Sequence, residues 1–314
     1  MKQEASAGSL YNSPSGDGGK KYKGIIVPAI TPLTTSFKID EKAVEKIFNQ
    51  FYEHNISPFI LGTTGESASL SNRIKADYLN AAAKNKKIGS ILYAGISSNI
   101  FEESVEFTKL CADYAVDAVA ATLPSYYALN NGQMQKYFED LADAIPLPLI
   151  IYNIPATTHM SIPLEVIDEL SMHPNIVAVK DSERSEERLM KSLELWKDRR
   201  DFGHFLGWAG KSAMALIGGS DGLIPSTGNL APEIYSAMYN AFTEGNFKEV
   251  YAMQLLSDKY GDLYQKDKTL GESLWALKVL MHEKGLCEAV VMPPLQPLAD
   301  GEADKLKIEL GNLK

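Results

Sequence analysis

The chain of 314 residues contains 45% apolar and 23% charged residues and carries a formal net charge of −9. This balance is typical of a globular protein with a substantial core. The negative charge and the absence of long Lys/Arg runs argue against a nucleic-acid partner, because binding the phosphate backbone requires clustered cations. No apolar run reaches the roughly 20 residues needed to cross a bilayer.

The start of the chain is rich in Gly, Ser and Lys and lacks the apolar core of a secretion signal. We expect residues 1–22 to form a flexible tail outside the fold. Cys111 and Cys287 can form neither a disulfide framework nor a C-x-x-C metal site, which favours ordinary buried thiols in a reducing compartment. These features together favour a cytoplasmic protein.

From Lys23 onward, short runs rich in β-branched residues alternate with longer amphipathic stretches. In one such stretch, Asp40 is placed to cap a helix whose apolar face carries Val44, Ile47 and Phe51. The nearly continuous apolar character of the short runs is expected of strands covered on both faces. The runs expected to form strands are Gly24–Pro28, Pro58–Leu61, Ile88–Tyr93, Ala118–Thr122, Leu147–Tyr152, Ile176–Lys180, Phe202–Gly207 and Gly222–Ile224.

Eight strand–helix units within about 220 residues favour a closed (β/α)8 TIM barrel over an open doubly wound sheet. We assign residues 23–230 to the barrel and residues 231–314 to its last helix and a C-terminal helical extension. No break in composition marks a second domain, so we expect the extension to pack on the barrel or on another subunit. In such barrels the chemistry lies where strands end and the following loops begin.

Lys180 ends the sixth expected strand. An amine at the end of an apolar strand loses solvation, which lowers its pKa and makes the neutral nucleophile available. Such a lysine attacks a ketone to form an imine, which is an electron sink for making or breaking an adjacent C–C bond. The alternative is a lysine that extends from the strand end into solvent.

Two other strand ends carry groups that suit the same chemistry. Tyr152 ends the preceding strand, so its phenol can lie beside Lys180 and move protons; it can equally cap the core with its hydroxyl in water. The Gly-Thr-Thr-Gly turn at 62–65 offers hydroxyl and backbone N–H groups that suit a carboxylate. A turn of this kind is also a common way for a strand to meet a helix.

Metal and serine-nucleophile chemistry are not expected. The five histidines show no paired spacing of metal ligands, and no H-E-x-x-H motif occurs. No G-x-S-x-G nucleophile elbow is present either.

Taken together, these motifs resemble the dihydrodipicolinate synthase/N-acetylneuraminate lyase family of pyruvate-dependent Schiff-base aldolases. Each motif alone is weakly specific, but five in the same order and spacing, from about residue 23 to the end, are specific. The resemblance makes the solvent-exposed alternative for Lys180 improbable. The matching segments are GTTGE (62–66), PSYY (124–127), YNIP (152–155), VKDS (179–182) and GLIPSTGN (222–229).

The resemblance implies a role for each matching residue. Lys180 is similar to the Schiff-base lysine of the family, and Tyr152 to its proton-shuttling tyrosine. Thr63 matches the hydroxyl relay. Thr64 matches the threonine that holds the pyruvate carboxylate, and Gly62 opens the same turn.

Two further positions follow from the same resemblance. Tyr126 resembles the tyrosine that family members lend across a tight dimer interface to complete the relay of a neighbour. Ile224 matches the position whose backbone carbonyl lies near the lysine. The family is usually a dimer or a tetramer of dimers, and it needs no metal and no organic cofactor.

Two departures from the family pattern disfavour a biosynthetic synthase regulated by lysine. Synthases that act on aspartate semialdehyde carry an arginine where this chain has Thr157, and a threonine cannot form a bidentate ion pair with a carboxylate. The histidines of the usual lysine-inhibition site correspond to Asn72 and Lys75.

A third departure concerns the second substrate. Sialic-acid lyases carry an Asp-Glu pair after the glycine of the seventh strand, whereas here Gly207 is followed by Trp208, Ala209 and Gly210. Small residues at this point resemble 4-hydroxy-2-oxoglutarate aldolases. Trp208 either narrows the pocket for the second substrate or packs the barrel mouth. His159 replaces a usual glycine and either contacts substrate or is simply a loop residue.

The sequence therefore predicts a lyase that attaches pyruvate to Lys180 and reversibly cleaves a 2-oxo-4-hydroxy acid into pyruvate and an aldehyde. Condensation of pyruvate with aspartate semialdehyde is the alternative. Dehydration or deamination through the same imine comes third, and a non-catalytic relative that binds a 2-oxo acid is disfavoured. We expect a homodimer or homotetramer with small-molecule substrates and no membrane partner.

Overall fold

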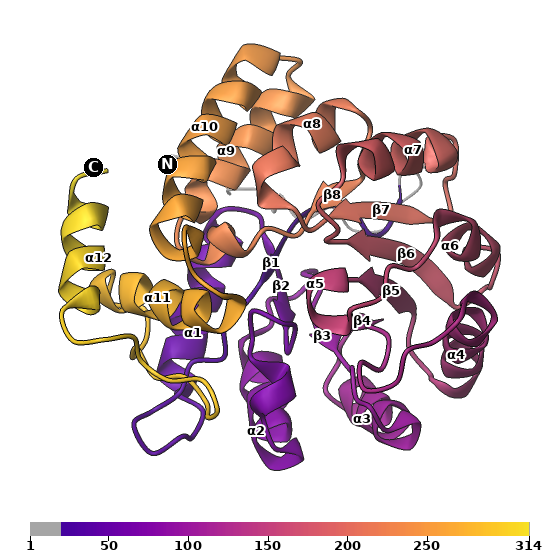
Figure 1. The fold of residues 1–314 in the computed structure, drawn as a ribbon, viewed down its shortest axis with the longest axis horizontal. Helices are drawn as coiled ribbons and strands as arrows, with labels where there is room; N and C mark the ends of the chain where they lie inside the picture. The colour runs from indigo at the N-terminus through magenta and orange to yellow at the C-terminus, as the bar shows by residue number, and fades with distance from the viewer. Residues whose placement is uncertain (1–19, 314) are drawn as a thin grey trace, which may run out of the picture.

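The structure, a computed structural model, describes residues 20–313. Eight parallel strands form a closed barrel in the order β1 to β8, with β8 pairing with β1, and helices surround it (Figure 1). The predicted (β/α)8 barrel with additional C-terminal helices is thus confirmed. The strands are β1 (Gly24–Pro28), β2 (Ser57–Ile60), β3 (Tyr93–Gly95), β4 (Ala118–Ala121), β5 (Leu149–Asn153), β6 (Ile176–Asp181), β7 (Gly203–Leu206) and β8 (Gly222–Leu223).

The helices follow the strands in alternation, and the last ones extend beyond the barrel. Short 3-10 turns, η1 (Ser67–Ser69), η2 (Ala209–Lys211) and η3 (Ser226–Asn229), follow β2, β7 and β8. The helices are α1 (Glu41–Glu53), α2 (Asn72–Asn85), α3 (Phe101–Asp113), α4 (Asn131–Ala144), α5 (Pro155–Thr158), α6 (Leu164–Leu170), α7 (Glu186–Trp196), α8 (Ser212–Ile217), α9 (Pro232–Thr243), α10 (Phe247–Gln265), α11 (Leu270–Glu283) and α12 (Glu302–Gly311).

Local sequence accounts for the first helix. The Asp40 side chain accepts hydrogen bonds from the backbone N–H groups of Lys42 and Ala43, which satisfies two of the free donors at the start of α1. The apolar face predicted for this helix, including Val44 and Phe51, is buried against the barrel core. None of the helices in the described part of the chain is long and apolar enough to traverse a bilayer.

The strands direct alternate side chains to two different cores. Residues such as Phe59, Ile150 and Phe205 form a cluster inside the barrel, whereas their neighbours along each strand, such as Ile151, pack outward against the helices. Lys180 has the inward phase, because it lies two residues after Ala178 of the inner cluster. The inward positions at the carboxyl ends of the strands therefore carry the candidate site.

The third strand was predicted wrongly. It runs over Tyr93–Gly95 and not over Ile88–Tyr93, and Ile88 is 99% exposed. Gly89 adopts a φ of 82°, which breaks the extended backbone just where the apolar residues begin. An apolar run thus led the prediction into a surface turn.

The first residues of the described chain pack against the barrel. Lys20 forms an ion pair with Asp221 at 2.7 Å, and Tyr22 lies 7% exposed in the inner cluster with its ring 6.1 Å from that of Tyr93. The expectation of a tail over 1–22 is therefore wrong for residues 20–22. Its remainder, residues 1–19, lies outside the described residues.

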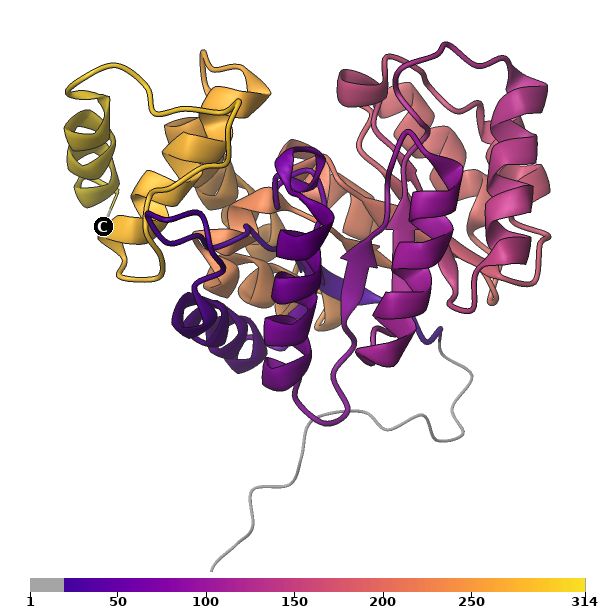
Figure 2. The same cartoon turned by 90° about the horizontal axis from the view of Figure 1, so that it is seen from below.

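The C-terminal helices lie together at one side of the barrel, in orange and yellow in both views (Figures 1 and 2). Helix α10 packs on α9, and α11 and α12 pack on α10 and on each other. Helix α11 is buried on nearly all sides, since nine of its residues, from Ser273 to Met281, are buried.

His204 links β7 to the surrounding helices. Its ring lies 3.1 Å from the Ser192 hydroxyl of α7 and 3.0 Å from the Ser220 hydroxyl, and the residue is 2% exposed. Burial lowers the pKa of His204 to about 4, although the carboxylates of Asp181 and Asp221 oppose the shift.

We predict an acid-dependent loss of stability from this histidine. Between its unfolded pKa near 6.5 and its folded pKa, only the unfolded chain binds the proton, so stability falls as pH falls through this window. The contribution is roughly 2 kcal/mol between about pH 7 and about pH 4.5. Urea unfolding of wild type and His204→Gln at both pH values checks this, and an equal acid loss in the two proteins would contradict it.

Candidate active site

Lys180 lies at the carboxyl end of β6, directly beside Tyr152 of β5 in the parallel register. It is 3% exposed. Its Nζ lies 3.8 Å from the centre of the Tyr152 ring and 4.9 Å from that of Phe59. The lysine thus points into the barrel against two aromatic rings, and the solvent-exposed alternative is wrong.

Burial sets the chemistry of this pair. Loss of solvation lowers the pKa of Lys180, and Tyr152 only partly opposes the shift. Burial alone would raise the pKa of Tyr152, but the Lys180 charge and the hydroxyls of Thr63 and Ser182 hold it below its ordinary value. The amine is therefore available as a nucleophile, and the phenol can pass a proton to and from a group bound beside it.

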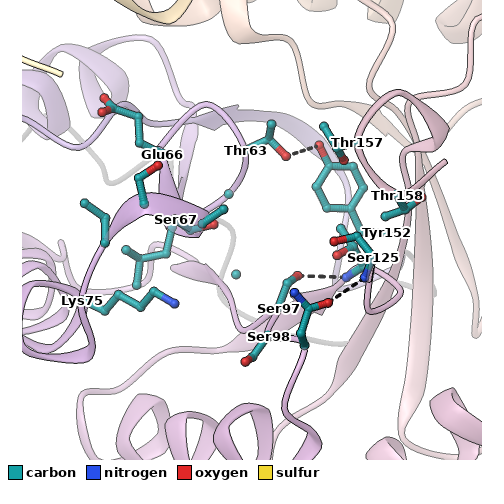
Figure 3. Close-up of a pocket in the computed structure, with 18 of the residues that line it drawn as sticks. Thr63, Glu66, Ser67, Lys75, Ser97, Ser98, Ser125, Tyr152, Thr157 and Thr158 are labelled. Carbon is teal, nitrogen blue, oxygen red and sulfur yellow. Dashed lines mark hydrogen bonds between the residues drawn. The ribbon is translucent and has the colours of Figure 1, made fainter. Parts of the chain in front are cut away.

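The turn after β2 brings a third group to this pair. The Thr63 Oγ1 lies 3.3 Å from the Tyr152 hydroxyl, and Figure 3 shows the two side chains directed toward one another at the edge of a neighbouring pocket. The turn is tight, because the N–H of Gly65 donates to the Gly62 carbonyl at 3.1 Å. It also needs a glycine on the next strand, since a Cβ at Gly95 would collide with the carbonyl oxygen of Leu61.

A cavity of about 550 Å³ opens above the lysine. This volume is ample for pyruvate together with a small aldehyde, given that ligand pockets commonly span roughly 300–1,000 Å³. Most of the predicted site residues line it together: Thr63, Thr64, Tyr152, Lys180, Gly207, Trp208 and Ile224.

Three predicted residues lie elsewhere. Gly62 and Thr157 line a second cavity of about 640 Å³, which shares Thr63 and Tyr152 with the first. Tyr126 lines neither cavity of its own chain: it is 77% exposed and stacks edge-on against Tyr127 with ring centres 4.9 Å apart.

His159 also lies outside both cavities. It is exposed and adopts a φ of 58° where α5 ends, which is the left-handed conformation that favours glycine. Its backbone position explains why a glycine suits this site. Within residues 20–313, no group of three or more His, Cys, Asp or Glu side chains is placed to hold a metal ion.

Ser182 is a site residue that sequence reasoning missed. It lines the Lys180 cavity, and its hydroxyl acts on Tyr152 as a hydrogen-bonding group. Gly207 makes room for it, because a Cβ at Gly207 would collide with the Ser182 hydroxyl. The available signal was the spacing: residues two apart on a strand face the same side, so Ser182 follows Lys180 into the cavity.

A buried polar network outside the barrel wall also escaped prediction. Asp181 accepts hydrogen bonds from Arg188 Nε at 2.6 Å and from Asn153 Nδ2 at 2.9 Å. The side-chain carbonyl oxygen of Asn153 in turn accepts from the N–H of Ile162. Because Asn153 and Asp181 adjoin Tyr152 and Lys180, this network ties the two strand ends together from behind.

Comparison with known proteins points to one family. The sequence model of the Dihydrodipicolinate synthetase family matches residues 21–312. A 4-hydroxy-tetrahydrodipicolinate synthase of Methanosarcina mazei is 29% identical over 294 residues, which cover 93% of this chain and 98% of the relative. An uncharacterized DapA-like lyase of Pyrococcus furiosus is 32% identical over 288 residues, covering 89% and 93%.

Solved structures agree in fold. Dihydrodipicolinate synthase from Bacteroides thetaiotaomicron is similar with a TM-score of 0.88 and 27% identity, covering 94% of this chain and 99% of that chain. YagE of Escherichia coli, a prophage protein of the dihydrodipicolinic acid synthase family solved in complex with pyruvate, has a TM-score of 0.87 and 22% identity over 93% and 99%. At that identity the second likeness shows the fold alone.

The coupling between Lys180 and Tyr152 predicts a measurable pH dependence. Competitive acetylation of Lys180, read by mass spectrometry, should show a midpoint below the ordinary lysine pKa of 10.5, because burial disfavours the ammonium. Tyr152 raises the pKa of Lys180, so Tyr152→Phe should move the midpoint further down. A midpoint at or above 10.5, or an upward shift in the variant, would contradict this account.

Proposed function

Since the chain belongs to the dihydrodipicolinate synthetase family, we propose that it is a lyase that attaches pyruvate to Lys180 as a Schiff base. The observation that carries this proposal is the buried Lys180 amine held against Tyr152, whose hydroxyl faces Thr63. No step needs a metal or an organic cofactor.

The geometry suggests how the reaction proceeds. The backbone N–H groups and hydroxyls of the Thr63–Thr64 turn hold the carboxylate of the 2-oxo acid. The neutral Lys180 amine attacks the C2 carbonyl, water leaves, and a protonated imine forms. Tyr152 delivers the proton that the departing hydroxyl needs, with Thr63 as the next hydroxyl in the relay.

The imine then accepts electrons from the adjacent carbon–carbon bond. In a bound 2-oxo-4-hydroxy acid, loss of the 4-hydroxyl proton to Tyr152 breaks the C3–C4 bond, releases an aldehyde and leaves the enamine of pyruvate. Protonation of the enamine at C3 and hydrolysis of the imine return pyruvate and free Lys180. The same steps in reverse form the bond, so the proposal covers both directions.

The second substrate separates this reaction from the alternative. Thr157 stands where a synthase would carry its arginine and cannot form a bidentate ion pair with a carboxylate, which favours a 2-oxo-4-hydroxy acid over aspartate semialdehyde. The names of relatives such as the M. mazei synthase favour aspartate semialdehyde. Arg184 and Lys268 also line the cavity, and either cation could meet a distal anionic group of the second substrate.

We expect reduction with borohydride in the presence of pyruvate to add the mass of the reduced pyruvyl group to Lys180. Lys180→Met should keep the fold and lose both the adduct and turnover, because the variant has no amine against the Tyr152 ring. Mass spectrometry of the digested protein locates the adduct. Absence of an adduct on wild-type Lys180 would overturn the proposed function.

A substrate panel then chooses between the reactions. It contains 2-oxo-4-hydroxy acids with and without a distal carboxylate or phosphate, assayed for pyruvate release, and pyruvate with aspartate semialdehyde, assayed for condensation. Release from the hydroxy acids supports the proposal. Appreciable activity with the semialdehyde alone would assign the chain to the alternative reaction.

We also propose that the enzyme is a cytoplasmic homodimer, or a tetramer of dimers, in which Tyr126 completes the site of a neighbour. The high exposure of Tyr126 and Tyr127, away from the cavity of their own chain, supports an intersubunit role. The thiols of Cys111 and Cys287 are free and buried, which suits a reducing compartment.

Mixed dimers test the role of Tyr126. Lys180→Met and Tyr126→Phe should each have little activity alone. In a mixed dimer, one site receives both defects and the other receives an intact Lys180 and an intact Tyr126. Reassociated equal mixtures should therefore recover roughly a quarter of wild-type activity. No recovery, with exchange of subunits confirmed by native mass spectrometry, would rule out the shared site.

A further inference from the structure

A fully buried ion pair lies just behind the Thr63–Thr64 turn. Glu66 ends the turn, and its Oε1 lies 2.5 Å from Nζ of Lys278 in the middle of α11. Both side chains are 0% exposed. The pair therefore joins the loop after the second barrel strand to the C-terminal helical extension.

The remaining polar atoms of the pair join a third segment. The other carboxylate oxygen of Glu66 accepts a hydrogen bond from the N–H of Met292 at 2.7 Å. Lys278 Nζ donates to the carbonyl of Val290 at 2.6 Å. The loop after β2, helix α11 and the segment that follows this helix thus meet at two buried charges.

Such a pair is a poor choice for stability alone. Taking two charges out of water is costly, and well-packed apolar residues in place of a buried pair are often equally or more stabilising. What a buried pair does supply is a defined geometry, because neither charge tolerates the loss of its partner. Because the pair lies beside the turn that carries Thr63, the geometry that it fixes is that of the turn.

The pair is rigidly connected to the catalytic turn. Glu66 adopts a φ of 57°, a left-handed conformation that is uncommon for a residue with a side chain. Its own N–H donates to the Thr63 carbonyl at 3.0 Å. The turn is also held from the loop after β1, where the Thr31 hydroxyl donates to the Gly65 carbonyl at 2.5 Å. Figure 3 shows Glu66 directed away from Tyr152 while Thr63 faces it.

Helix α11 also forms part of the cavity walls. Leu270 and Leu274 line both cavities, and Ser273 and Leu277 line the cavity that holds Lys180. Lys278 follows Leu277 directly, so the helix that shapes the cavity is the helix that the ion pair anchors.

We propose that Glu66 and Lys278 are positioning residues, which lock the Thr63–Thr64 turn against α11 so that its hydroxyls meet Tyr152 and the substrate carboxylate. The C-terminal extension is on this account a component of the active site and not only a packed appendage. The expected change in the KM for pyruvate rests on the proposed function. The expected changes in melting temperature and in the acetylation of Lys180 rest on the geometry alone.

The central test is Lys278→Met, compared with the double variant Glu66→Gln/Lys278→Met. The single variant leaves a carboxylate buried without its partner, so it should lower the melting temperature and raise the KM for pyruvate. In the double variant no charge is left buried, and the new amide oxygen still accepts from the N–H of Met292. Its melting temperature should return toward wild type while its KM stays raised by roughly 10- to 100-fold, with a smaller change in kcat, because the turn has lost its anchor.

A matched control separates position from stability. Asp221→Asn removes the ion pair with Lys20 at the opposite end of the barrel, where the strands begin. It should lower the melting temperature and leave the KM for pyruvate unchanged. Recovery of KM together with melting temperature in the double variant would overturn the proposal, as would an unchanged KM in Lys278→Met.

Two further measurements keep the test decisive. If Lys278→Met does not fold, Glu66→Gln alone is the milder variant, and the same rise in KM is expected. If wild-type Lys180 forms no pyruvate adduct, the proposed function is wrong, but the positioning role can still be tested. The pH midpoint of Lys180 acetylation then reports whether the turn still holds Thr63 against Tyr152. The midpoint should shift in Lys278→Met, because the Thr63 hydroxyl loses its contact with the Tyr152 hydroxyl, and it should not change in Asp221→Asn. An unchanged midpoint in Lys278→Met would overturn the positioning role.

Discussion

Lys180 is buried against the ring of Tyr152, and the cost of keeping an ammonium ion there without water lowers its pKa. The proposed chemistry depends on this one interaction. A solvated lysine would remain charged and could not attack a carbonyl at neutral pH. The charge that Lys180 carries when protonated and the Thr63 hydroxyl in turn hold the pKa of Tyr152 below its ordinary value. The pair therefore lies where the proposed imine must gain and lose protons.

The barrel supplies this contact through backbone geometry. Parallel pairing places Tyr152 and Lys180 side by side with both side chains inward, and the Asp181 network fastens the strand ends from outside. Close approach at two glycines completes the arrangement: Gly95 admits the Leu61 carbonyl, and Gly207 admits the Ser182 hydroxyl. The site is therefore held by paired strands and not by flexible loops alone.

The proposed positioning pair extends this logic to the catalytic turn after β2, which is a loop. Thr63 and Thr64 lie on a turn, and a turn needs support from elsewhere to keep its hydroxyls within reach of Tyr152. Glu66 and Lys278 connect it to α11, which is buried on nearly all sides. The helical extension thus supports the turn that would hold the 2-oxo acid, and Trp208 lines the same cavity.

Sequence alone indicated the alternation of strands and helices, the closed barrel and the placement of Tyr152 beside Lys180, because strand ends in a parallel barrel converge on one face. The role of Thr63 beside Tyr152 came from the family resemblance. It misplaced β3, since an apolar run resembles a strand even where Gly89 turns the chain. Only the tertiary structure decided that Thr157 lies beyond the Lys180 cavity and that Glu66 meets Lys278. Periodicity and strand ends are local properties of a chain, whereas contacts between distant segments depend on how the barrel closes and how the last helices pack on it.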